Sequence, residues 1–96
     1  MVELDQNRIA DFCRRNGIVR LELFGSAARG DARPDSDLDF LVEFAPESHI
    51  GFLALGRIRQ ELELLTGRRV DLVPRGGLKP LLRDHVIAEA QSVYPS

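Results

Sequence analysis

Two apolar runs separated by a polar segment constrain the fold of this chain more than any other feature of its sequence. The first run, Ile18–Phe24, is rich in Ile, Val, Leu and Phe and ends at Gly25, which is typical of a buried strand. The second run, Leu38–Phe44, predicts another strand, and the polar segment between the two runs predicts a loop. Side chains alternate along a strand, so one face of the second strand is expected in the core. That face comprises Leu38, Phe40, Val42 and Phe44, and the opposite face comprises Asp37, Asp39, Leu41 and Glu43.

Apolar residues at helical spacing predict three helices around these strands. The first is expected over residues 4–16, the longest over Phe52–Thr66 with a stop at Gly67, and the last over residues 79–90. A short helical turn is expected over residues 26–29, with Ser26 at its N-cap. The single cysteine, Cys13, lies in the first helix and is expected to be a small core residue.

A third and shorter strand is expected over residues 69–73, because the apolar residues there are followed by Pro74. Gly76-Gly77 then predicts a flexible loop. This order of helices and strands predicts a small α/β or α+β domain with a three- or four-stranded sheet.

The length and charge of the chain limit its function class. Its 96 residues predict one domain over residues 1–96, too short to include a second substrate-binding domain. The net charge of -2 gives no general electrostatic reason to bind nucleic acid or anionic lipid. No apolar run approaches the ~20 residues of a membrane span, and the N-terminus lacks a signal-peptide pattern. These features predict a soluble, cytoplasmic protein.

Two aspartates stand one residue apart at the start of the second predicted strand. Asp37 and Asp39 would point the same way, and their carboxylates would repel each other unless a positive charge lies between them. Mg²⁺ prefers hard oxygen ligands and commonly takes one or two carboxylates, with phosphates and water completing its shell. The alternative is that both acids are solvated residues at the entrance of a strand.

Gly25-Ser26 and Asp71 add to this acidic pair. A glycine and a serine between a strand and a short helix can hold phosphate oxygens, although they can equally end the strand and cap the helix. Asp71 lies in an otherwise apolar strand, where an unpaired carboxylate would be costly to desolvate. If that strand lies beside the second, Asp71 joins the pair in holding metal; otherwise it pairs with Arg68, Arg69 or Arg75.

Gly25-Ser26, ten intervening residues and Asp37-Leu38-Asp39 together resemble the signature of the nucleotidyltransferase fold shared with DNA polymerase beta. The fuller match comprises Phe-Gly-Ser-Ala-Ala-Arg-Gly, Ser-Asp-Leu-Asp-Phe-Leu-Val and Gly-Arg-Arg-Val-Asp-Leu-Val. It is similar to the minimal nucleotidyltransferases of bacteria and archaea and covers nearly the whole chain. The resemblance implies a small nucleotidyltransferase fold with a mixed sheet flanked by helices.

The same resemblance implies roles for individual residues. Gly25 and Ser26 would hold the triphosphate of ATP, and Arg29 would lie near the phosphates, unless it is a surface arginine paired with Asp31 or Asp35. The residues implied as Mg²⁺ ligands and catalytic acids are Asp37, Asp39 and Asp71.

Many such proteins resemble the antitoxin of a two-gene, type VII-like system whose toxin is an all-helical HEPN-domain ribonuclease. The resemblance implies that the antitoxin transfers AMP from ATP to a tyrosine of this toxin and can also bind the toxin directly. Two other functions stay open, namely a catalytically idle antitoxin that neutralises by binding, and nucleotide transfer to a small molecule or an RNA end. Direct binding of nucleic acid is not expected, and no residue pattern decides whether the chain self-associates.

Overall fold

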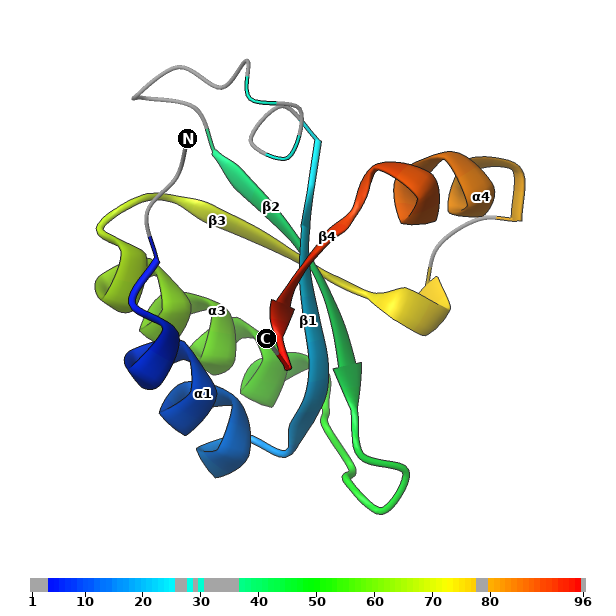
Figure 1. Ribbon diagram of the computed structural model, residues 1–96. Helices are drawn as coiled ribbons and strands as arrows, with labels where there is room; N and C mark the ends of the chain where they lie inside the picture. Colours follow the sequence, from blue (N-terminus) through cyan, green and yellow to red (C-terminus); the bar gives the residue numbers. More distant parts are fainter. Residues whose placement is uncertain (1–3, 26–27, 29, 31–36, 78–79, 96) are drawn as a thin grey trace.

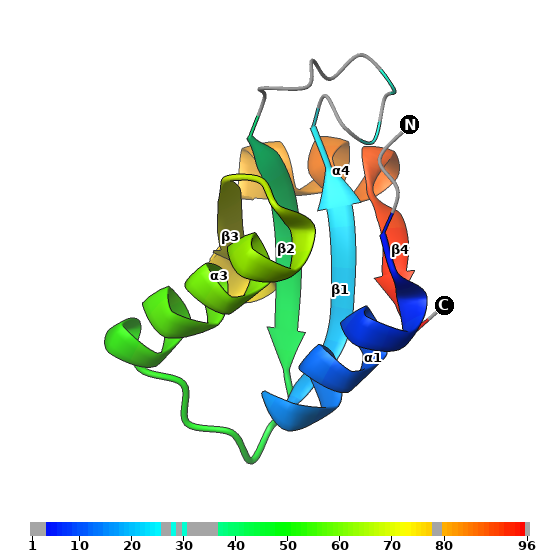
Figure 2. The same ribbon diagram turned by 90° about the vertical axis from the view of Figure 1, so that its left-hand side faces the viewer.

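The computed structural model describes residues 4–25, 28, 30, 37–77 and 80–95. Helices α1 and α3 lie on one face of a sheet, and α4 lies on the opposite face (Figures 1 and 2). The elements of the described residues are α1 Gln6–Arg15, β1 Ile18–Phe24, β2 Leu38–Phe44, α3 Phe52–Thr66, β3 Val70–Pro74, the 3-10 helix η1 Arg75–Gly77, α4 Pro80–Glu89 and β4 Gln91–Tyr94.

The sheet is four-stranded and mixed, with the strand order β3-β2-β1-β4. Strand β1 pairs antiparallel with both β2 and β4, whereas β2 and β3 are parallel. A parallel pair needs a crossover connection, and α3 provides it. Strands β2 and β3 therefore start at the same end of the sheet, where β1 ends (Figure 2). The predicted fold class, a mixed sheet flanked by helices, is confirmed.

The main core lies between the sheet and helices α1 and α3. Alternation along β2 sends Leu38, Phe40 and Val42 into this core, as predicted, while Phe44 is half-buried at its border. Cys13 is fully buried there, as expected of a small core residue. Burial of each large apolar side chain contributes roughly 1.5–3 kcal/mol. The helical and remaining strand side chains of the core are Ile9, Phe12, Ile58, Leu62, Ile18, Leu21, Leu23, Val70, Leu72 and Val93.

Local signals explain where the helices begin and end. The Asp5 carboxylate caps α1 by accepting hydrogen bonds from the backbone N–H groups of Asn7 and Arg8, at 3.1 and 3.2 Å. Gly67 ends α3 in the left-handed conformation, with φ of 71°, and its N–H donates to the carbonyl of Glu63. Both signals are visible in the sequence, and α3 has the predicted bounds.

The second face of the sheet is more covered than the sequence predicts. Leu41 was expected opposite the core, yet it is completely buried. It lies on β2 between Glu22 of β1 and Val73 of β3, its partners in register. Arg75, directly after β3, reaches back to Glu22 with 3.1 Å between Nη1 and Oε1, and both side chains are largely buried. This ion pair crosses β2 on the face of Leu41 and helps to exclude water from it.

Two elements near the C-terminus differ from the prediction. Strand β4 was not predicted, because only Val93 and Tyr94 of its four residues are apolar and no alternation is visible. It exists because its backbone pairs with the free edge of β1. Gly76-Gly77, predicted as a flexible loop, belongs to the 3-10 helix η1. Within the described part of the chain, no helix is both long and apolar enough to cross a membrane.

Candidate active site

Two strand pairings bring the predicted site residues to one end of the sheet. Phe24 of β1 pairs with Asp39 of β2, and Asp39 pairs with Asp71 of β3. Gly25 directly follows the last residue of β1, so Gly25, Asp39 and Asp71 form a row at one end of the sheet, where neighbouring strands lie about 4.8 Å apart. Because Leu38 is buried in the main core, Asp39 points to the opposite face of the sheet. The register therefore joins residues that are far apart in the sequence.

Gly25 and Asp39 touch. The backbone of Gly25 has φ of 73°, a left-handed conformation that favours glycine. A Cβ added to Gly25 would lie 2.5 Å from Oδ2 of Asp39, closer than such atoms can approach. Only a glycine therefore leaves the Asp39 carboxylate in its place, and this close approach is a second reason for glycine beyond ending the strand.

Asp37 and Asp71 flank this contact and are both exposed to solvent. The expectation that strand β3 would desolvate Asp71 is wrong, because β3 is an edge strand and Asp71 points away from the main core. Asp37 Oδ1 lies 3.3 Å from Nε of Arg69, in an ion pair whose side chains are 55% and 81% exposed. Such an exposed pair is weak, so Arg69 is easily displaced from Asp37.

The carboxylates supply the right donor type for Mg²⁺, since this ion prefers hard oxygen ligands and is bound by carboxylates together with phosphates and water. In the described part of the chain, no group of three acidic, histidine or cysteine side chains is already gathered closely enough to hold a metal ion. Asp39 and Asp71, paired in register, and Asp37 beside them are the residues that could hold it. The fit of donor type and register supports a metal site that is completed by the phosphates of a nucleotide.

Two predicted site residues, Ser26 and Arg29, lie outside the described residues. Between them, Ala28 is buried, and its carbonyl accepts a hydrogen bond from Nε2 of Gln91 at 2.8 Å. Gln91 is the first residue of β4, so this strand is tied to the segment that follows Gly25. Sequence reasoning missed Gln91, because a single amide in an unpredicted strand carries no recognisable signal.

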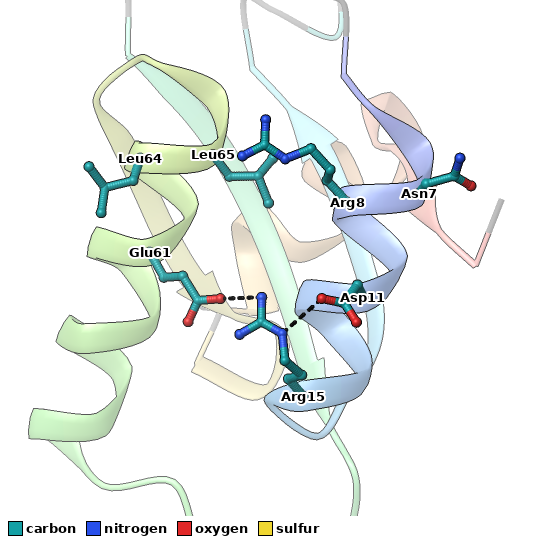
Figure 3. A pocket seen from close by; sticks show the side chains of 7 residues that line it. All are labelled: Asn7, Arg8, Asp11, Arg15, Glu61, Leu64 and Leu65. Carbon is teal, nitrogen blue, oxygen red and sulfur yellow. Dashed lines mark hydrogen bonds and ion pairs between the residues drawn. The ribbon is translucent and has the colours of Figure 1, made fainter.

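A separate hollow of about 350 Å³ lies between α1 and α3 (Figure 3). At its base, Arg15 Nε contacts Asp11 at 2.9 Å, and Arg15 Nη2 contacts Glu61 at 2.8 Å. The hydrogen bonds to these carboxylates raise the pKa of Arg15 above its ordinary value. None of the predicted site residues lines this hollow, which is on the face of the sheet that α1 and α3 cover. The Arg15–Glu61 ion pair at its base joins the two helices, and the hollow is not the candidate active site.

Comparison with known proteins gives a consistent family. Residues 7–93 match the family described as the nucleotidyltransferase domain. A protein of Methanocaldococcus jannaschii, provisionally named a protein adenylyltransferase, is 35% identical over 88 residues, which are 92% of each chain. A protein adenylyltransferase of Thermococcus cleftensis is 40% identical over 75 residues, which are 78% of this chain and 74% of that protein.

The fold also matches a solved structure. A crystal structure of a toxin–antitoxin with AMP-PNP contains a chain that superimposes with a TM-score of 0.79 at 25% sequence identity. The match covers 97% of this chain and 75% of that chain.

Proposed function

This chain belongs to the nucleotidyltransferase domain family and is a nucleotidyltransferase, and we propose that it is a minimal, single-domain antitoxin of the type VII-like class. It transfers AMP from ATP to a tyrosine of a HEPN-domain ribonuclease toxin and thereby silences the toxin. The row formed by Gly25, Asp39 and Asp71 carries this proposal, because it places Asp39 beside the glycine and Asp71 opposite Asp39. Both the ATP substrate and a ribonuclease target place the reaction in the cytoplasm.

The related proteins support the substrate and the partner. Two relatives at 35% and 40% identity carry the name protein adenylyltransferase. The toxin–antitoxin structure at 25% identity was determined with AMP-PNP, an analogue of ATP. The resemblance of the sequence to antitoxins of HEPN-domain toxins supports a toxin of this type as the partner.

In the proposed reaction, the tyrosine oxygen attacks the α-phosphorus of ATP. A new phosphorus–oxygen bond forms, the bond from the α-phosphorus to the bridging oxygen breaks, and diphosphate leaves. Gly25 lets the backbone approach the triphosphate, which Ser26 and Arg29 also hold. Asp71 accepts the phenolic proton. Asp37, Asp39 and Asp71 are the residues that would hold Mg²⁺, and the ion would supply positive charge that offsets the negative charge of the phosphates.

The decisive experiment is the intact mass of the protein encoded by the neighbouring gene, the expected toxin, after incubation with this protein, ATP and Mg²⁺. We expect mass increments of one or more adenylyl groups, which disappear with EDTA or with the Asp37→Asn/Asp39→Asn variant. Peptide mapping would locate the modified residue, which we expect to be a tyrosine.

Two other results would overturn this proposal. A stable complex that neutralises the toxin without any mass increment would identify an idle antitoxin that acts by binding. Nucleotide transfer to a purified aminoglycoside or an RNA end, with no modification of the toxin, would identify a different acceptor.

A further inference from the structure

A side chain of α3 holds the first residue of β3. Glu63 Oε2 accepts a hydrogen bond from the backbone N–H of Val70 at 2.9 Å. Its other oxygen, Oε1, lies 3.0 Å from Nη1 of Arg59 on the same helix. The Glu63 side chain is 25% exposed, so this carboxylate is partly shielded from water. A hydrogen bond to an ionised acceptor in such surroundings is stronger than one between neutral groups.

The Val70 N–H is the group that needs such a partner. The carbonyl of Arg69 accepts from the Leu38 N–H at 2.9 Å, so residue 69 faces β2. Backbone groups of successive strand residues point to opposite sides, so the Val70 N–H faces away from β2. Because β3 is at the edge of the sheet, none of the described strands lies on that side to accept this N–H. The Glu63 carboxylate supplies the acceptor that a neighbouring strand would otherwise provide.

The connection between α3 and β3 gives Glu63 further control over the start of β3. Its backbone carbonyl accepts the N–H of Gly67 at 2.8 Å, so Glu63 contacts the turn with both its backbone and its carboxylate. Thr66 Oγ1 also bonds the carbonyl of Leu62 at 2.9 Å, which closes the last turn of the helix. Only three residues, 67–69, separate the helix from β3.

We propose that Glu63 is a positioning residue for AMP transfer, which fixes the backbone at Val70 and thereby holds Asp71 opposite Asp39. Asp71 is the next residue along the chain and pairs in register with Asp39. Since Asp71 is exposed at a sheet edge, its surroundings do little to fix it, and the backbone must supply the order. Glu63 itself does not touch the row of site residues. This inference rests on the proposed function.

The chain offers a matched control on the same helix. Glu61 is 34% exposed and pairs with Arg15 of α1 at 2.8 Å, but it points toward α1 and not toward β3 (Figure 3). Glu63→Ala and Glu61→Ala each remove one partly shielded carboxylate of α3 and one ion pair. Glu63→Gln keeps an oxygen that can accept the Val70 N–H, although it removes the charge.

We expect Glu63→Ala to lower kcat for AMP transfer about ten- to hundredfold, because small misplacements of catalytic groups have effects of this size. KM for ATP should change by less than about threefold, since Glu63 binds no substrate group. The affinity of the free protein for Mn²⁺, measured by electron paramagnetic resonance, should fall, and amide exchange at Val70 should accelerate. Glu63→Gln should recover part of each property. Glu61→Ala should lower the melting temperature without changing kcat or Mn²⁺ affinity.

Equal losses of kcat in Glu63→Ala and Glu61→Ala would overturn the inference, because the effect would then be general destabilisation. Faster exchange at Val70 with unchanged kcat and unchanged Mn²⁺ affinity would also overturn it. The Mn²⁺ and exchange measurements need neither toxin nor ATP. If the wild-type protein transfers no AMP, the proposed function fails, and these two measurements decide separately whether Glu63 orders the acidic site.

Discussion

At the scale of single residues, two glycines share a backbone conformation but differ in their surroundings. Gly25 and Gly67 have φ of 73° and 71°. An added Cβ would collide with Asp39 at Gly25, but would meet no atom within 4 Å at Gly67. Alanine should therefore cost about 1–2 kcal/mol of stability at either position through its left-handed conformation. Only at Gly25 should it also displace a site carboxylate.

We accordingly expect Gly25→Ala to abolish most AMP transfer and Gly67→Ala to preserve it. Urea unfolding and initial rates measured on both variants test this expectation. Equal activity of the two variants would show that the contact with Asp39 is not needed for the reaction.

Cys13 predicts a pH dependence of stability. Burial raises the pKa of its thiol from 9.0 to about 12. Above pH 9 the unfolded chain loses the thiol proton while the folded protein keeps it, so the unfolded state binds fewer protons. The free energy of unfolding should then fall as the pH rises from 9 towards 12, by up to about 1.4 kcal/mol per pH unit. Urea unfolding at a series of pH values should show a shallower fall for Cys13→Ala, and parallel curves would contradict this assignment.

At the scale of elements, β4 links the sheet to the segment that follows Gly25. Replacing Gln91 by alanine removes the hydrogen bond to the carbonyl of Ala28. If that segment holds the triphosphate, KM for ATP should rise by roughly fivefold, as expected for about 1 kcal/mol. Ser92→Ala is the matched control, because its Oγ donates to the nearby carbonyl of Pro95. A similar KM for ATP in both variants would show that the Gln91 hydrogen bond does not contribute to nucleotide binding.

The elements also show which signals in the sequence are sufficient to predict where a helix or strand begins and ends. Strands β1 and β2 and helix α3 have their predicted bounds, because their apolar patterns are followed by a glycine or, for β2, by Ala45-Pro46. Strand β4 has no such pattern, and its pairing with β1 is a long-range contact that local propensity does not report. The burial of Leu41 was not predicted for the same reason, since the ion pair that helps to cover it joins residues from two other elements.

At the scale of the whole molecule, the Glu22–Arg75 ion pair ties β1 to the segment after β3. The side chains of Arg75 and Glu22 are only 16% and 12% exposed, so removing one partner leaves the other as an uncompensated, largely buried charge. Arg75→Met should therefore destabilise the protein by about 3 kcal/mol. The double variant Glu22→Met/Arg75→Met should recover much of this loss. A double-mutant cycle by urea unfolding tests it, and additive losses would contradict the coupling.

The candidate site was predictable in its composition but not in its geometry. Gly25, Asp37, Asp39 and Asp71 could be named because glycine and acids at strand ends form a recognisable pattern. The alignment of Asp39 with Asp71 follows from the register of β2 and β3, which only the packed sheet fixes. Contacts such as Glu63 with Val70 depend on the crossing of a helix over a sheet edge, and no spacing in the sequence encodes them.

The pairing of β1 with β4 joins segments that the ribosome makes at very different times. Leu21 pairs with Tyr94, so β1 is synthesised long before its partner exists. At about 5–20 residues per second, this delay lasts for seconds, far longer than a hairpin needs to form. During that interval one edge of β1 presents unpaired backbone groups, which invite association with other chains. The nascent protein is therefore expected to be most prone to edge-to-edge association before β4 is made.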